Sequence, residues 1–394
     1  MSNLPSVAGQ TILQVIPELS AGGAERTVIE MAEAITEAGG RALVASEGGR
    51  LVKELETAGG QHIFMELATK NPVAIFRNAL RLTDLIKQDG VSLVHARSRA
   101  PAWSAWRAVQ ATGTAFVTTY HGAYSGTSGP KKAYNSIMAK GDFVIANSRW
   151  IGHRVKEIHE VPDDRIVIIP RGVDFDHFHA DAVKPERVAS LRRDWSLVDS
   201  DKRLVILLPA RLTEWKGQRL ALEALTLLSA EERASLVLVF AGDAQGRSAY
   251  VDKLQTYIAE HGLVKSIRIA GHCVDMPAAY AAADIVLNPS LRPEAFGRTA
   301  AEAAAMERPV IAADHGGAQE TVIDGQTGVR FAPGEAQSLA AALRSLISVG
   351  ADARLGMGRA GRNHVKAHYS KRGLQAATLS VYSSLIAQGI AQRA

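Results

Sequence analysis

Short runs of apolar and β-branched residues alternate along the chain with longer segments in which apolar residues recur every three or four positions. The short runs have the length of buried strands, whereas the longer segments have the period of amphipathic helices. Seven short runs begin between Thr11 and Arg165, and five more begin between Arg203 and Pro309. Strands that alternate with helices predict an α/β fold with parallel sheets covered by helices on both faces.

The pattern restarts near residue 200, after a polar stretch, which predicts two Rossmann-like doubly wound domains. A chain of 394 residues also exceeds the size, about 250–300 residues, at which single cores stop growing. We expect an N-terminal domain over residues 1–182, a C-terminal domain over 183–372 and a final amphipathic helix over 373–394. Such domains bind ligands at the carboxyl ends of their strands, so we expect the site in a cleft where these ends face each other.

The composition is typical of a folded protein from a reducing compartment. Cys273 is the only cysteine, which excludes a disulfide within the chain. The N-terminus lacks the basic start and apolar core of a signal peptide, and no run of about 18 apolar residues is present to span a membrane. We therefore expect a cytoplasmic protein and leave open a peripheral position on the inner face of the cytoplasmic membrane.

Positive charge is concentrated in one segment of the chain. Residues 67–141 hold ten Lys or Arg but two acidic residues, Asp84 and Asp89. This asymmetry favours an anionic partner, a membrane surface or a phosphate, over nucleic acid. A solvated basic face without a partner remains the alternative.

Two motifs at predicted strand ends have residues that suit phosphate. Gly22 and Gly23 stand between a strand and a helix, where backbone N–H groups can approach an anion, although a plain tight turn is as good an interpretation. Arg211 and Lys216 flank a turn into another helix, and together they can neutralise a diphosphate without a metal. The alternative is a helix-capping ion pair with Glu214.

Glu294 and Glu302 lie eight residues apart around Gly297. If a helix begins near Phe296, eight helical residues rise about 12 Å. That exceeds the separation of about 5–9.5 Å between the paired carboxylates of glycoside hydrolases. We therefore expect that each glutamate binds a separate hydroxyl-bearing group and that the two do not form one acid–base pair. The N–H groups of Phe296, Gly297 and Arg298 would then face a phosphate or sugar oxygen. A helix N-cap acid plus an exposed mid-helix glutamate is the alternative.

Several motifs together resemble the family 4 retaining glycosyltransferases of the GT-B fold, of the bacterial envelope polysaccharide, lipopolysaccharide or glycolipid type. They are SAGGAE from Ser20, ANS from Ala146, IPRGVDFDHF from Ile169, ARLTEWKG from Ala210, AGD from Ala241 and NPSLRPEAFGRTAAEAAAMERPVIAADHGG from Asn288. The motifs keep the family's order over nearly the whole chain. Arg171 departs from the pattern, because many members carry Asn there.

The resemblance implies which residues bind the donor. In such enzymes the residue matching Glu294 contacts the donor sugar, the one matching Glu302 holds the ribose, and those matching Arg211 and Lys216 bind the diphosphate. The further donor-binding residues, which contribute mostly backbone groups, are Gly22, Gly23, His272, Cys273, Phe296, Gly297 and Arg298. The final helix of such enzymes crosses back onto the N-terminal domain.

The resemblance also implies the chemistry. A sugar would pass from a nucleotide diphosphate donor, with UDP-sugars favoured, to an acceptor hydroxyl with retention of the anomeric configuration. His121 matches a histidine near the transferred sugar and, with Glu294, Arg211 and Lys216, forms the expected catalytic set. We expect no cofactor and no catalytic metal, and we interpret DFD from Asp174 as a structural turn.

The acceptor is expected on the N-terminal domain and to be a lipid-linked or lipopolysaccharide-type glycan. The candidates for the acceptor or membrane side are Arg97, Arg99, Tyr124, Lys131 and Lys132. Basic residues beside aromatic ones suit an anionic membrane surface, whereas core packing of the nearby tryptophans is the rival interpretation. Two other functions remain possible for the whole chain: a nucleotide-sugar 2-epimerase of the same fold, or a non-catalytic subunit that binds a nucleotide or glycan.

Overall fold

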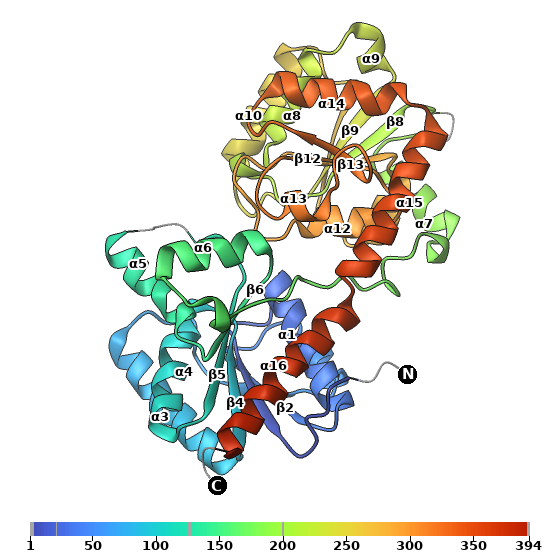
Figure 1. The fold of residues 1–394 in the computed structure, drawn as a ribbon. Helices are drawn as coiled ribbons and strands as arrows, with labels where there is room; N and C mark the ends of the chain where they lie inside the picture. Colours follow the sequence, from blue (N-terminus) through green and yellow to red (C-terminus); the bar gives the residue numbers. More distant parts are fainter. Residues whose placement is uncertain (1–3, 21, 125–127, 199–200, 392–394) are drawn as a thin grey trace. The chain divides into compact units, whose positions relative to one another are not determined.

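The computed structural model describes residues 4–20, 22–124, 128–198 and 201–391. The chain divides into two compact units. Unit 1 comprises Met1–Gly172 with Lys371–Ala394, and unit 2 comprises Val173–Ser370. Each unit contains one parallel sheet with helices on both of its faces (Figure 1). The predicted α/β fold with two Rossmann-like units is confirmed.

The sheet of unit 1 has seven strands in the order β3-β2-β1-β4-β5-β6-β7. The strands are β1 (Thr11–Val15), β2 (Arg41–Ser46), β3 (Gln61–Phe64), β4 (Val91–Ala96), β5 (Ala115–Tyr120), β6 (Phe143–Ala146) and β7 (Ile166–Ile168). The helices are α1 (Gly23–Glu37), α2 (Val52–Thr57), α3 (Pro72–Gln88), α4 (Arg99–Thr112), α5 (Gly129–Asn135), α6 (Arg149–His159) and α16 (Lys371–Ala391). The strand order reverses between β1 and β4, and the loops that follow such a pair are where ligands of doubly wound sheets bind.

The sheet of unit 2 has six strands in the order β10-β9-β8-β11-β12-β13 and reverses between β8 and β11. The strands are β8 (Leu204–Leu208), β9 (Leu236–Ala241), β10 (Ile267–Gly271), β11 (Ile285–Asn288), β12 (Val310–Ala313) and β13 (Gly328–Phe331). The helices are α7 (Pro185–Asp194), α8 (Gln218–Thr226), α9 (Ala230–Ala234), α10 (Ser248–Glu260), α11 (Met276–Ala282), α12 (Arg298–Ala305), α13 (Ala318–Thr321), α14 (Ala336–Ser348) and α15 (Ala351–His368). Of these strands, β13 is the one that the hydrophobic pattern did not predict.

Both faces of the unit 2 sheet are buried in apolar cores, which explains its continuous apolar strands. Along β8, Val205 and Leu207 belong to one core cluster, whereas Ile206 and Leu208 belong to the cluster on the opposite face. Successive side chains of a strand point to opposite faces, so the residues of β8 from Val205 to Leu208 are all buried, on one side or the other.

The segment after residue 172 packs with unit 2. The N–H of Val173 donates to the carbonyl oxygen of Tyr369 over 2.7 Å, and both Val173 and Phe178 are buried in a unit 2 core. We expected the divisions after residues 182 and 372, whereas they fall after Gly172 and Ser370. Helix α16 is part of unit 1, where the side-chain amide of Gln375 donates to the carbonyl oxygen of Glu30 over 2.8 Å.

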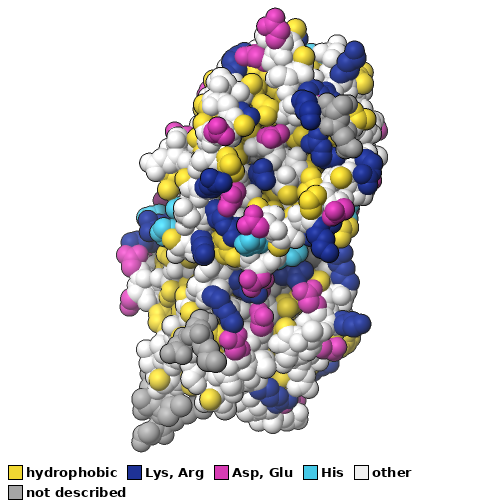
Figure 2. All heavy atoms as spheres, turned by 90° about the vertical axis from the view of Figure 1, so that its right-hand side faces the viewer, with side chains coloured by type: hydrophobic (Ala, Val, Ile, Leu, Met, Phe, Trp, Pro, Cys, Tyr) yellow, Lys and Arg dark blue, Asp and Glu magenta, His cyan; other side chains and the backbone are white. Residues whose placement is uncertain are grey.

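Basic, acidic and apolar side chains are interspersed over the face shown in Figure 2. None of the helices in the described part of the chain is both long and apolar enough to cross a membrane.

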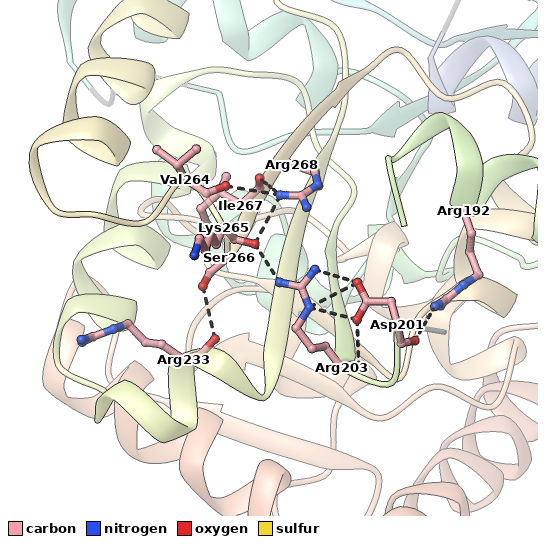
Figure 3. Close-up of polar contacts among 9 residues, drawn as sticks. All are labelled: Arg192, Asp201, Arg203, Arg233, Val264, Lys265, Ser266, Ile267 and Arg268. Atoms are coloured by element: carbon pink, nitrogen blue, oxygen red, sulfur yellow. Dashed lines mark hydrogen bonds and ion pairs between the residues drawn. The ribbon is translucent and has the colours of Figure 1, made fainter. Parts of the chain in front are cut away.

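An ion pair at the start of β8 fixes the amino edge of the unit 2 sheet (Figure 3). The Arg203 guanidinium donates to both carboxylate oxygens of Asp201, at 2.6 Å for Nη2, and to the carbonyl oxygen of Lys265 at 2.7 Å. These hydrogen bonds lower the pKa of Asp201 to about 2. The two side chains are 24% and 12% exposed, so solvent screens the pair less than an ordinary surface pair.

We predict that Asp201→Asn lowers the free energy of unfolding at neutral pH by about 1 kcal/mol. The depressed pKa means that the charged Asp201 stabilises the fold fully above about pH 4 and that this stabilisation is lost as the pH falls toward 2. Urea unfolding at several pH values measures the difference, which should close at low pH. Asp252→Asn, an exposed position on α10, is the control and should show little effect. An equal effect of both variants would contradict the prediction.

Candidate active site

Two loops at the carboxyl edge of the unit 2 sheet hold an ion pair. Gly217 has a φ of +79°, and a Cβ on it would lie 2.0 Å from the carbonyl oxygen of Pro289, so only glycine lets the loop after β8 pack on the loop after β11. Lys216 precedes this glycine, and its Nζ lies 2.6 Å from Oε1 of Glu294. The two side chains are only 13% and 15% exposed. The structure thus brings together the lysine expected to bind diphosphate and the glutamate expected to contact the sugar.

Glu294 is held in place by both its side chain and its backbone. Its carboxylate accepts a hydrogen bond from the hydroxyl of Ser290, and its carbonyl oxygen accepts one from the N–H of Gly317 over 2.8 Å. A Cβ on Gly316 would lie 2.5 Å from that carbonyl oxygen, so the loop after β12 also needs a glycine there. Ser290 was not among the predicted site residues, although a hydroxyl four residues before Glu294 was a signal that the sequence contained.

Arg211 lies at the same edge of the sheet, outside that ion pair. Its Nη1 donates to Oε1 of Gln245 over 3.4 Å, and the described residues place no carboxylate within 4.0 Å of its guanidinium. Glu214, the alternative partner, lies 4.0 Å from Nζ of Lys253 instead. The capping ion pair between Glu214 and Arg211 or Lys216 is therefore wrong, and the charge of Arg211 faces solvent.

Glu302 lies on α12 and is only partly exposed. Its Oε2 accepts from the hydroxyl of Tyr280 over 3.0 Å, and its Oε1 accepts from Nε of Arg298 over 2.6 Å. Its side chain is 13% exposed, so the alternative of an exposed mid-helix glutamate is wrong. Burial, and then the neighbouring Glu302 carboxylate, raise the pKa of Tyr280 well above its usual value, which keeps the phenol protonated as a donor.

Helix α12 begins at Arg298, two residues later than expected. Gly297 is its N-cap in a left-handed conformation with φ +80°, which turns the chain just before the helix. Glu294 therefore lies in the preceding loop, and the separation estimated from helical rise does not apply to it. Phe296 is 3% exposed and packs edge-on against Tyr369, so its side chain belongs to the core and only its backbone is available to a ligand.

His272 and Cys273 follow β10 in a loop, as expected. His272 is exposed, whereas Cys273 is half-buried against a unit 2 core. Burial raises the pKa of the Cys273 thiol, whose Sγ lies 3.6 Å from the carbonyl oxygen of Asp275. A protonated, half-buried thiol is a packing group, which leaves the backbone of this loop for any contact with a nucleobase.

The glycine turn of unit 1 lies beside a carboxylate of the chain. Gly22 is the N-cap of α1 with φ 140°, and a Cβ on it would lie 2.5 Å from Oε2 of Glu25. Burial raises the pKa of Glu25, and the backbone N–H groups at the helix start and the Arg171 charge oppose that rise. The helix start beside Gly22 and Gly23 therefore has a carboxylate of the chain next to it.

His121 directly follows β5 and is held on two sides. The side-chain amide of Asn147 donates to its carbonyl oxygen over 3.2 Å, and Nη2 of Arg171 lies 3.2 Å from its Nδ1. Since a guanidinium can only donate, Nδ1 accepts and the imidazole proton lies on Nε2. That Nε2 is buried and has no partner among the described residues. Burial, then Arg171 and Arg97, lower the pKa of His121 well below its usual value, so the ring is a neutral donor.

Arg97 is an interior residue, contrary to its predicted place on the acceptor or membrane side. It is 3% exposed, and its guanidinium donates to Oε1 of Gln14 over 2.6 and 3.0 Å. The same buried network includes His95, whose Nδ1 lies 2.6 Å from the hydroxyl of Tyr382 on α16. Arg97 follows β4 at the strand-order reversal, where burial against α16 leaves it no contact with a membrane surface.

The other predicted acceptor-side residues gather near the starts of α4 and α5. The Arg99 guanidinium lies 4.1 Å from the ring centre of Tyr124 and donates to Asn135 over 2.7 Å. Burial raises the pKa of Tyr124 to about 12. Lys131 is exposed on α5, whereas Lys132 is half-buried.

The Asp-x-Asp sequence forms a turn. Oδ1 of Asp174 accepts from the N–H groups of Asp176 and His177 over 3.0 and 3.2 Å. Across the described residues, no group of three or more His, Cys, Asp and Glu side chains is placed to hold a metal ion.

The sequence matches two known families of glycosyltransferases. Residues 192–364 match the family described as glycosyl transferases group 1, and residues 21–177 match glycosyltransferase family 4. A solved glycosyltransferase from Rickettsia africae ESF-5 is 35% identical, with a TM-score of 0.88 over 96% of this chain and 98% of that one. The chain belongs to the family 4 glycosyltransferases and has their GT-B fold.

Other relatives are more distant. A D-inositol 3-phosphate glycosyltransferase of Xylanimonas cellulosilytica is 31% identical over 49% of this chain and 45% of its own length. The chain spans about half the length of the first curated relatives that it matches. HepE of Anabaena, solved with UDP and glucose, shares the fold with a TM-score of 0.80 and 22% identity over 95% of this chain and 100% of that one.

We predict that Arg171→Asn raises the pKa of His121 toward its ordinary value of 6.5, because the variant removes a neighbouring positive charge. The pKa should stay below 6.5, since burial is the larger cause. Nitrogen-detected NMR of the His121 ring over a pH series measures both the titration and the protonated nitrogen. Arg171→Lys keeps the charge and should retain most of the depression. A titration of His121 that is unchanged in Arg171→Asn would refute the assignment.

Proposed function

We propose that this glycosyltransferase transfers a sugar from a nucleotide diphosphate donor, a UDP-sugar by preference, with retention of configuration and without a metal ion. The observation that carries the proposal is the site at the β8 and β11 ends. There, Lys216 and Glu294 form a largely buried pair, and Arg211 beside them has no carboxylate partner among the described residues. Cations that are held in place, and whose charge the neighbouring carboxylates do not fully neutralise, suit a diphosphate.

The roles within unit 2 follow from its contacts. Arg211 and Lys216 bind the diphosphate, and the remaining lone pairs of the Glu294 carboxylate accept hydroxyl hydrogens of the sugar. Glu302 already accepts from Tyr280 and Arg298, which fixes its carboxylate so that its free lone pairs can accept from a ribose. The backbone of the Gly297 turn and of the loop with His272 and Cys273 completes the donor site.

The proposed transfer breaks the bond between the anomeric carbon and the donor's phosphate oxygen and forms a bond from the acceptor oxygen to the same face of that carbon. The hydroxyl proton passes to the leaving diphosphate, so the products are a glycoside and a nucleoside diphosphate. Arg211 and Lys216 stabilise the charge that develops on the leaving group. His121 contributes a neutral Nε2–H that donates to a hydroxyl of the sugar, and it is not the base.

Two relatives support the choice of substrates. The Anabaena structure contains UDP and glucose, which favours a UDP-sugar donor. The curated relatives named D-inositol 3-phosphate glycosyltransferase favour a hydroxyl acceptor. Unit 1 is assigned the acceptor and unit 2 the donor, and a lipid-linked or lipopolysaccharide-type glycan is the acceptor class that we favour.

A membrane-bound acceptor fits one surface of unit 1. Val73, Phe76 and Leu80 of α3 are 77%, 56% and 53% exposed. They lie three or four residues apart on one helix face, and the exposed Arg77 and Arg81 directly follow Phe76 and Leu80. An apolar helix face with interleaved arginines suits an anionic lipid surface, into which the apolar side chains insert while the arginines stay at the headgroups. We therefore propose α3 as the contact with the inner face of the cytoplasmic membrane.

Arg211→Ala should lower the transfer rate at least about a hundredfold and remove most of the thermal stabilisation by UDP-sugars, because the leaving diphosphate loses a cation. Thermal shift with a panel of nucleotide sugars, followed by transfer assays with labelled donors, measures both effects. The position is exposed, so the fold should be unaffected. Lys253→Ala removes another exposed cation of unit 2 and is the matched control.

The same assays separate the proposal from its rivals. Transfer that continues in EDTA supports the metal-free step, and transfer that stops until a divalent ion is restored contradicts it. Epimerised nucleotide sugar formed without an acceptor would identify an epimerase. Donor binding without turnover in the presence of any acceptor would identify a binding subunit.

For the membrane contact, Phe76→Ser with Leu80→Ser should weaken binding to vesicles that contain anionic lipid about tenfold or more, since two apolar side chains no longer insert. Co-sedimentation with anionic and with zwitterionic vesicles measures binding. Val264→Ser, which changes a valine of unit 2 that is 62% exposed, is the control. Vesicle binding that changes neither with the lipid charge nor with the α3 substitutions would rule out this surface.

A further inference from the structure

A cavity of about 660 Å³ opens in unit 1 between the starts of α3, α4 and α5. It is lined by polar and aromatic side chains, chiefly Lys70, Arg99, Trp103, Lys131 and Tyr134, and by Ile75 of α3. Among the described residues that line it, none is Asp or Glu. The volume falls within the range of about 300–1,000 Å³ that is usual for small-molecule sites, and it is far larger than a phosphate ion alone requires.

The positive charge of the cavity is not neutralised by the chain. Lys70, Arg99 and Lys131 all line it, and within the described ranges none of the three has a carboxylate oxygen within 4.0 Å. Arg99 is partly buried and contacts neutral groups: Asn135 at 2.7 Å and the ring centres of Tyr124 and Tyr134 at 4.1 and 5.6 Å. The three positive charges around the cavity repel each other. An anion that binds in the cavity reduces this repulsion and is attracted by all three side chains.

The cavity also has surfaces for an uncharged sugar ring. Trp103 and Tyr134 line it, and their faces can pack against the C–H groups of a saccharide. The Nε1 of Trp103 is buried and has no hydrogen-bond partner among the described residues. The lining therefore suits a molecule that combines an anionic group with an uncharged, hydroxyl-bearing part.

The cavity lies at the edge of the sheet where His121 lies. Strands β4 and β5 pair in parallel, with Ala96 opposite Thr118, so the start of α4 and His121 follow neighbouring carboxyl ends. Tyr124 connects the two places: it packs under the Arg99 guanidinium, and its ring centre lies 4.4 Å from that of Tyr120, the residue before His121.

We propose that this cavity binds the phosphate of a phosphorylated saccharide acceptor, with Lys70, Arg99 and Lys131 on the phosphate and Trp103 and Tyr134 against the sugar. The inference rests on the proposed function, which assigns the acceptor to unit 1, and it names the acceptor class as one that carries a phosphate. The phosphate belongs either to a soluble sugar phosphate or to the head of a lipid-linked saccharide, since the cations recognise the same group in both.

The test compares binding of glucose 6-phosphate and of glucose to the full-length protein by isothermal titration calorimetry. A second arm measures binding to phosphatidylcholine vesicles with and without a polyprenyl phosphate. We expect Arg99→Gln to weaken phosphate binding about tenfold, because one charge-assisted contact is lost, and Arg99→Lys to recover part of it. Arg107→Gln removes an exposed arginine further along the same helix, outside the lining, and should bind as the parent does.

Weaker phosphate binding by Arg99→Gln but not by Arg107→Gln supports the inference. Whether the weakening is seen with glucose 6-phosphate or with polyprenyl phosphate vesicles identifies the source of the phosphate. Glucose bound as tightly as glucose 6-phosphate, equal loss in both variants, or no binding in either arm would overturn it. Thermal shift by UDP-sugars on the same samples keeps the two proposals apart. Normal donor stabilisation with any of these negative results rejects only the phosphate-bearing acceptor, whereas absent donor stabilisation rejects the proposed function.

Discussion

The close approach of backbone to backbone at the carboxyl edge of the unit 2 sheet is the constraint on which its site depends. Gly217, Gly316 and Gly317 each stand where a Cβ would lie within 2.5 Å of backbone atoms of the loop that follows β11. Their contacts hold two loops, the one after β8 and the one after β12, against the loop that contains Glu294 and so fix its backbone. The ion pair with Lys216 is possible because these loops meet there.

Charge is balanced differently in the two units. In unit 2, carboxylates of the chain partly neutralise the cations, and Lys216 keeps Glu294 at 2.6 Å. In unit 1, the cations around the cavity have no such partner among the described residues, whereas Arg97 is buried with Gln14 as its hydrogen-bond acceptor. A buried charge without an opposite charge is costly, so its environment has to be well bonded or occupied. The network through Tyr382 meets that need for Arg97 and ties α16 into unit 1.

Periodicity and motifs predicted most of the fold and named Lys216 and Glu294, which the structure brings together. They failed where long-range contacts decide. Strand β13 was missed because it is a short edge strand that begins with Gly328, which lacks a side chain so that its backbone can pack on Val310. Arg97 was misplaced because a basic residue after a strand carries no local sign of burial under α16. The partnership of Arg171 with His121 spans fifty positions and two strand ends, so no local pattern contains it.

The contact between Lys216 and Glu294 does not prevent Lys216 from binding a diphosphate. An ammonium group has three N–H donors, so Lys216 can keep its bond to Glu294 and still direct a donor at a phosphate oxygen. The carboxylate has further lone pairs for sugar hydroxyls, and Ser290 restricts its rotation. In unit 1, by contrast, the Glu25 carboxylate lies beside Gly22 at the α1 start, where its negative charge would repel a ligand phosphate. Burial raises the pKa of Glu25, which means that its charge is held at some cost in this place. Because like charges repel, the glycine turn is open to a phosphate only when the Glu25 side chain moves aside.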